Sequence, residues 1–557
     1  MQKELLRLSA ANEGDLCSGF RLVKKEYVPS KNADLYTMRH EKTKAELLYF
    51  ARADENKTFA IAFKTLPEDD TGVFHILEHS VLNGSRRFPV REPFVNLLQS
   101  SMQTFLNAMT YPDKTVYPVC SRNDKDFHNL MEVYLDAVFC PAIYEKPQIF
   151  MQEGWHYEFD SEDAEPYYNG VVYSEMKGAF SDVSELMETE SMRLLFPDSS
   201  YGFVSGGHPE SIPKLSYEQF IANHKRYYHP SNARIFLDGK MDIDEILRYI
   251  DGEYLSKYDY RAPDFDFTVQ KQVVGEKTVS YSVKPGEEAK AHMVFSKLLC
   301  AHDEPEKVLA ANVLAKYLTG SNEAPLKRIF LEQALCQDIS LQVNDGIFQP
   351  YITLTIRNTE QEKFAQVEDC LRSSVQDILS GGLDRDALLA ELERMAFTSR
   401  EIEEPYGLIL GLTALDGWLY GDDPLTYIET AGIYDTLRQK ADTGYFADLL
   451  REMLGDTRTL CKVCLLPSET KAQEDQQAEK ARLEADIARW DHTAREKAYA
   501  DFQVMHQWQE TPDSPEALAT LPTLTLGDVS EDVAPISVKP EKEKLLRVET
   551  ESNGITY

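Results

Sequence analysis

The chain has 557 residues, enough for three or four domains, and its hydrophobic fraction of 43% is ordinary for globular protein. Its 93 acidic residues outnumber 59 basic ones, which gives a formal charge of −34. An acidic surface argues against nucleic-acid binding, because that needs clustered lysine and arginine to displace counterions from phosphates. The charge favours cationic partners such as basic peptides.

The amino-terminal segment and the cysteines favour a bacterial cytoplasmic setting. Residues 1–17 have no long apolar stretch and carry acids early, unlike a signal or transit peptide. No apolar run approaches the roughly 18 residues of a membrane span, so no membrane partner is expected. The eight cysteines are scattered. Cys461 and Cys464 form a CxxC in a strand-like apolar run with no second pair nearby, so we interpret them as structural.

Residues 1–265 are expected to form a first unit of mixed α and β structure, the catalytic one. The patterns predict, in chain order, two strands over 47–65 joined by a polar turn, a helix from about residue 72, a hairpin over 104–121 around a Pro-Asp-Lys turn, a helix over 124–139, and a turn, strand and helix over 227–250 with Asp242 or Asp244 as the helix cap.

Residues 266–467 repeat this order of elements in part and lack the histidine motif described below. The composition turns polar near 264–276, which marks the boundary. The patterns then predict strands at 278–284 and 291–296, a helix over 304–318, a strand pair around 337–357, helices to about 455 and a closing strand over 457–467. Two consecutive units of similar order indicate a duplication.

Residues 468–540 change character and predict a helical linker. Five residues mark one narrow apolar face in a run rich in Ala, Glu, Lys and Arg: Leu483, Ile487, Trp490, Ala494 and Ala498. This pattern predicts a long surface-lying helix or a helical hairpin. Residues 541–557 show strand-like alternation and an Asn-Gly turn, and we expect them to begin a third domain that is truncated at Tyr557.

The stretch His75-Ile-Leu-Glu78-His79 has the spacing of a metal site. On a helix His75 and His79 lie one turn apart on one face, so both imidazoles can reach one ion. Glu78 projects beside that face and can stay uncoordinated as a base. The order is the inverse of the H-E-x-x-H zinc motif. A pair of helix histidines alone is often structural, but the placed glutamate favours a catalytic zinc site.

A catalytic zinc needs a third protein ligand in addition to water. The downstream segment 169–182 offers Glu175, which follows a β-branched run and opens a helix. Glu185 and Glu188 lie nearby and are less constrained candidates. Local sequence leaves these three alternatives open.

These residues resemble the presequence-protease branch of the pitrilysin/insulinase metallopeptidases. The resemblance spans nearly the whole chain and is carried by HILEH, NGVVYSEMKG, EHSVLNGSRRFPVREPF, TFLNAMTYPDKTVYPV, QEGWHYEF, GGHPESIPKLSYEQF and YYHPSNARIFLDG. It implies that Glu175 is the third ligand of one Zn²⁺ with His75 and His79, and that Glu78 is the general base.

The resemblance also implies an α+β fold of two homologous pitrilysin-type domains, each an antiparallel-rich sheet packed with helices, followed by a helical linker. An extended peptide adds a strand to a sheet edge beside the zinc, where Asn107 and Ala108 would contact its backbone. In the family a second half contributes an arginine and a tyrosine near the substrate carbonyl. We therefore expect this chain to be the amino-terminal half of a longer enzyme.

Two functions follow from these patterns. The first is a zinc endopeptidase that degrades unfolded peptides. The second is a zinc-bound peptide-binding or partner-docking half that needs the missing carboxyl-terminal half for turnover. A serine hydrolase is disfavoured because no Gly-x-Ser-x-Gly elbow accompanies the histidines.

Overall fold

The computed structural model describes residues 6–287 and 290–529 in full and, beyond them, the backbone of four short strands. These strands are β17 (Val538–Lys542), β18 (Leu545–Val548), β19 (Glu551–Ser552) and β20 (Ile555–Thr556). The predicted Asn553–Gly554 turn lies outside the described residues. Among the described helices none is long and apolar enough to cross a membrane.

The first unit is built on a nine-stranded sheet of order β1-β2-β3-β4-β11-β5-β8-β6, with β7 also paired to β8. Its strands are β1 (Leu16–Cys17), β2 (Phe20–Val28), β3 (Ala33–His40), β4 (Glu46–Ala51), β5 (Lys57–Lys64), β6 (Gln103–Leu106), β7 (Met109–Thr110), β8 (Lys114–Ser121) and β11 (Ala233–Asp238). The two strands predicted over 47–65 are β4 and β5, and β11 inserts between them, parallel to β4 and antiparallel to β5.

Helices cover this sheet. They are α1 (Val73–Val81), α2 (Pro93–Ser100), α3 (Asp124–Phe139), α4 (Gln148–Glu153), α5 (Val171–Ala179), α6 (Val183–Leu195), α7 (Tyr217–Tyr227) and α8 (Ile243–Glu253). The short strands β9 (His156–Glu158) and β10 (Tyr167–Asn169) form a separate ribbon. Asp242 rather than Asp244 caps α8, because its side chain accepts the Glu245 N–H.

The second unit repeats the sheet topology of the first. Its five strands are β12 (Glu276–Ser282), β13 (Ala291–Leu298), β14 (Asp338–Asn344), β15 (Tyr351–Thr359) and β16 (Cys461–Ser468). Their order, β12-β16-β13-β15-β14, matches β4-β11-β5-β8-β6, and in both sheets the last strand of the unit inserts parallel to its first partner and antiparallel to its second. The α+β fold with two similar units is therefore confirmed, while the predicted domain limits stay a prediction.

The helices of the second unit are α9 (Pro305–Thr319), α10 (Pro325–Glu332), α11 (Phe364–Gly381), α12 (Arg385–Thr398), α13 (Tyr406–Trp418), α14 (Ala431–Lys440) and α15 (Tyr445–Leu454). Helix α9 follows β13 as α1 follows β5, but its sequence contains no histidine. The counterpart of α1 in the second unit therefore does not carry the motif.

Each unit lends a helix to the other unit's sheet. Along β5, Phe59, Ile61 and Phe63 pack into the core of the first unit, whereas Ala60 and Ala62 face α13 on the opposite side. In return, residues of α6 pack against the second sheet. The position of α13 was not predicted, because the contact joins segments that are far apart in the sequence.

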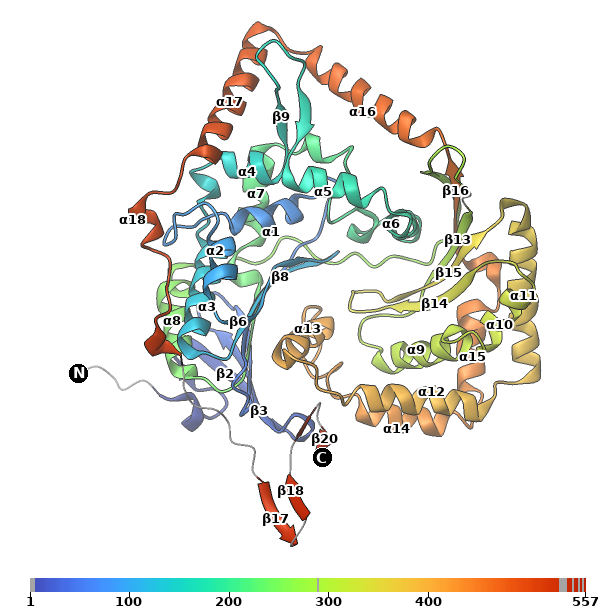
Figure 1. Ribbon diagram of the computed structural model, residues 1–557. Helices are drawn as coiled ribbons and strands as arrows, with labels where there is room; N and C mark the ends of the chain where they lie inside the picture. Colours follow the sequence, from blue (N-terminus) through green and yellow to red (C-terminus); the bar gives the residue numbers. More distant parts are fainter. Residues whose placement is uncertain are drawn as a thin grey trace.

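The linker forms α16 (Lys471–Ile487), α17 (His492–Glu510) and the short α18 (Pro515–Leu518). Figure 1 shows α16 and α17 meeting at a bend above β9. At this bend Trp490 packs edge-on against Tyr157 with ring centroids 4.8 Å apart. The break at 488–491 means that the stretch is not one continuous helix.

The two CxxC cysteines are structural, as the sequence indicated. Both lie on β16, and their side chains pack into different apolar clusters, Cys464 in the core of the second unit and Cys461 against the first. Burial raises the pKa of both thiols, that of Cys464 to about 11. Neither is poised as a thiolate ligand.

Leu410→Ala tests the packing of α13 on the first sheet. The Leu410 side chain is 3% exposed, and its truncation is expected to cost about 2–5 kcal/mol through lost burial and a cavity. Ile409 is 37% exposed on the same helix, so Ile409→Ala should cost less than about 0.5 kcal/mol. Denaturant unfolding of both variants measures the difference. Equal losses would contradict the packing described.

Candidate metal centre

Helix α1 starts at a glycine that allows a second segment to pass close by. Gly72 has φ = 67°, and a Cβ built there would lie 2.5 Å from the carbonyl oxygen of Gly206. Only glycine therefore lets the loop around Gly206 reach the start of α1. The Gly206 carbonyl accepts a hydrogen bond of 3.0 Å from Nδ1 of His75.

A buried carboxylate holds the second histidine. Nδ1 of His79 lies 3.3 Å from Oε2 of Glu153, at the end of α4, and Asn83 donates to the other Glu153 oxygen at 3.0 Å. A carbonyl and an ionised carboxylate only accept hydrogen bonds, so Nδ1 carries the proton in both histidines. Nε2 of each ring is left with its lone pair available for a metal.

The charge around His79 favours a cationic occupant. Burial alone would lower the pKa of this imidazole, but the hydrogen bond to Glu153 and the charges of Glu78, Glu153 and Glu175 raise it above its ordinary value. A proton and a metal cation compete for the same Nε2 lone pair. Metal binding at this centre should therefore weaken as the pH falls through that raised pKa.

Glu175 of α5 reaches both free nitrogens. Its Oε2 lies 3.7 Å from Nε2 of His75 and 3.8 Å from Nε2 of His79. Two ligands on a tetrahedral zinc, each about 2.0–2.1 Å from it, are about 3.4 Å apart, so the observed spacing is close to that of a three-ligand site. The Glu175 side chain is 53% exposed, which leaves the solvent side of the centre open.

Glu78 lies beside these three groups in a different environment. It is 9% exposed, and Thr110 of β7 donates a 3.0 Å hydrogen bond to its Oε2. Burial raises its pKa, and the charges of His79 and His75 and the Thr110 hydrogen bond oppose this only in part. One ligand atom from each of His75, Glu78 and His79 lies within 4.8 Å of the others. The carboxylate can thus act as a base next to a bound ion.

All the predicted site residues line one cavity of about 480 Å³, which also contains Glu185 and Gly206. Asn107 and Ala108 lie where the edge of the first sheet is interrupted, between β6 and β7. The carbonyl of Asn107 accepts from the Tyr134 hydroxyl at 3.1 Å, which fixes the backbone there.

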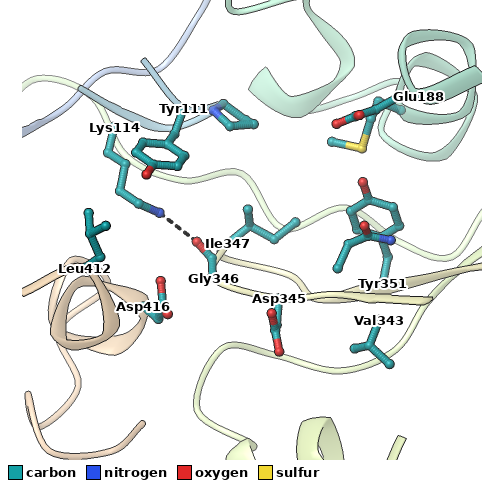
Figure 2. Close-up of a pocket in the computed structure, with 13 residues that line it drawn as sticks. Tyr111, Lys114, Glu188, Val343, Asp345, Gly346, Ile347, Tyr351, Leu412 and Asp416 are labelled. Carbon is teal, nitrogen blue, oxygen red and sulfur yellow. Dashed lines mark hydrogen bonds between the residues drawn. The ribbon is translucent and has the colours of Figure 1, made fainter. Parts of the chain in front are cut away.

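The structure separates the three candidates for third ligand. Within the described residues, Glu175 alone of the three makes a contact with His75 and His79. Glu185 lines the same cavity without touching either histidine, and Glu188 lines the neighbouring cavity drawn in Figure 2. The roles of these residues remain predictions.

Sequence reasoning missed the residues that orient the centre, namely Glu153, Gly206 and Thr110. Two of them lie in segments already quoted for the resemblance, QEGWHYEF and TFLNAMTYP. Their side-chain and backbone contacts with α1 depend on how distant segments pack, and no local pattern signals them.

Comparison with known proteins gives a consistent family. Three family models match consecutive parts of the chain: "Insulinase (Peptidase family M16)" over residues 66–177, "Peptidase M16 inactive domain" over 214–395, and the domain associated with subfamily C of the M16 peptidases over 465–557. The chain belongs to the M16 peptidase family. Within the pitrilysin/insulinase superfamily it lies in the presequence-protease-like branch, as the sequence resemblance indicated.

The curated relatives are longer proteins. The chain is 39% identical over 553 residues to "Protein HypA" of Clostridium perfringens, and the match covers 98% of this chain and 56% of that protein. It is 35% identical over 560 residues to "Presequence protease 1, chloroplastic/mitochondrial" of Arabidopsis thaliana, covering 97% and 52%. The chain spans about half the length of the curated relatives it matches.

Solved structures of low sequence identity share the fold. The periplasmic protease PqqL from Escherichia coli superposes with a TM-score of 0.59 at 14% identity, over 95% of this chain and 55% of that one. Pitrilysin superposes with a TM-score of 0.56 at 14% identity, over 84% and 50%. At this identity the likeness concerns the fold alone.

Glu153→Gln tests the role of the carboxylate behind His79. Loss of the charge removes the fixed acceptor of the Nδ1 proton, so affinity for a divalent metal should fall about tenfold. Chelator competition measures this affinity. Glu158→Gln is the matched control, because Glu158 pairs with His156 at 2.8 Å outside the centre. Unchanged affinity in Glu153→Gln, or equal losses in both variants, would contradict the assignment.

Proposed function

We propose that this chain carries the metal centre of a zinc-dependent endopeptidase that degrades unfolded peptides. The observation that supports this most is the convergence of His75 Nε2, His79 Nε2 and a Glu175 carboxylate oxygen beside a buried Glu78. Two imidazoles and a carboxylate are a donor set that suits zinc. Bound zinc supplies Lewis-acid activation of water and of the scissile carbonyl.

Glu78 acts as the general base and acid in this proposal. It accepts a proton from the attacking water and passes it to the leaving amine. Its raised pKa, caused first by burial, brings it closer to the operating pH than that of an exposed glutamate. The hydroxyl of Thr110 holds one carboxylate oxygen, so the other is free to face the reacting atoms.

The peptide binds as an added strand at the open edge formed by β6 and β7. Backbone hydrogen bonds at Asn107 and Ala108 would supply affinity with little demand on sequence. Such an edge accepts only extended chains, which selects unfolded peptides over folded proteins. The acidic net charge of the chain favours basic peptides.

A second function is supported by the length of the relatives. Because the chain spans about half of them, a zinc-bound half that binds peptides but needs a carboxyl-terminal half for turnover is the alternative. That half and unfolded peptides are the proposed partners. A fluorogenic-peptide assay of this chain, alone and extended to the length of its relatives, separates the two. Equal activity of both forms would refute the incomplete-half alternative.

Glu78→Gln tests the base directly. The amide cannot accept a proton, so peptide hydrolysis should fall by about 10²–10⁴ while zinc stays bound. Zinc content and initial rates on one unstructured peptide provide the two readouts. Glu185→Gln is the control in the same cavity and should retain hydrolysis. Retained hydrolysis in Glu78→Gln would refute its role.

A further inference from the structure

A fully buried carboxylate lies at the hairpin turn next to the metal centre. Asp113 is 0% exposed, in the Tyr-Pro-Asp-Lys turn that joins β7 to β8. The hydroxyl of Tyr201 donates to its Oδ2 at 2.6 Å, and that of Tyr420 lies 2.7 Å from the same oxygen. The ammonium of Lys114 is 3.4 Å from Oδ1. A buried charge is stable only with such donors.

These partners join the two units. Tyr420 follows α13 of the second unit, and its hydroxyl also lies 2.9 Å from the carbonyl oxygen of Gly346. Lys114 donates to the same carbonyl at 2.7 Å, as Figure 2 shows. Tyr201 accepts the Phe348 N–H at 2.8 Å. Gly346 and Phe348 belong to the loop between β14 and β15, so the equivalent hairpins of the two repeated units meet at this junction.

The turn controls a contact with Glu78. Tyr111 N–H donates to the Lys114 carbonyl at 2.8 Å and closes the turn. Directly before it, Thr110 pairs with Thr115 of β8 and gives its hydroxyl hydrogen to Glu78. A shift of the turn would therefore move the hydroxyl that fixes the carboxylate of the proposed base.

Packing alone does not fix the turn. Tyr111, Pro112 and Lys114 border a cavity of about 380 Å³ whose far side is formed by the β14–β15 loop and by Asp416 of α13. Figure 2 shows this space between the labelled side chains. Because one side of the turn faces open space, its hydrogen bonds to the second unit restrict its position.

We propose that Asp113, Lys114 and Tyr420 are positioning residues through which the second unit holds the β7 edge and, through Thr110, orients Glu78. The proposal rests on Glu78 acting as the base proposed above. None of the three contacts His75, His79 or Glu175 in the described structure, so the junction should affect turnover rather than metal binding.

Tyr420→Phe tests this role. It removes one hydroxyl and keeps the ring, and the loss of one hydrogen bond to a buried charge corresponds to about tenfold. We expect the Tyr111 amide to exchange with solvent about tenfold faster and kcat to fall about tenfold, with KM and zinc affinity within about twofold of the parent chain. Tyr427→Phe is the matched control, because that hydroxyl donates to the His302 carbonyl at 2.5 Å within the second unit.

Three results would overturn the proposal: parental exchange at Tyr111 in Tyr420→Phe, equal effects in Tyr420→Phe and Tyr427→Phe, or a loss of zinc affinity that parallels the loss of kcat. Hydrogen exchange and zinc affinity need no turnover. If the parent chain hydrolyses no peptide, the proposed function fails for this chain, and the exchange of Tyr111 still decides whether the junction holds the edge.

Discussion

The hydrogen bond at Nδ1 of each α1 histidine is the constraint on which the centre depends. Gly206 and Glu153 take the Nδ1 protons of His75 and His79, and both Nε2 atoms then face Glu175. Without these acceptors either ring could rotate or change tautomer, and the donor set would disperse. The glycine at the start of α1 and the packing of α4 matter in this arrangement because they bring the two acceptors within reach.

The sequence predicted what local chemistry determines. The spacing of His75, Glu78 and His79 placed the three on one helix, and the Asp242 cap and most strands followed from short-range patterns. The acceptors of the two histidines lie 131 and 74 residues away along the chain, and β11 inserts between two strands that are consecutive in sequence. Such contacts depend on tertiary packing, which residue periodicity does not encode.

The repeated topology gives the second unit a structural role although its counterpart of α1 lacks the metal motif. It supplies α13 to the first sheet and a hairpin loop to the turn beside Thr110, while α6 of the first unit packs against the second sheet. A duplicated unit can thus lack the donors and still be retained for contacts that hold the other copy. The buried Asp113 lies where the two copies meet.

The central claim is that one zinc ion binds at the Nε2 atoms of His75 and His79 and at Glu175. Anomalous diffraction from crystals grown with zinc, recorded on both sides of the zinc absorption edge, tests it directly. We predict one peak about 2.0–2.2 Å from these three donors, with Glu78 uncoordinated. A peak that replaces Glu175 by Glu78, or the absence of any peak at the two histidines, would contradict the account.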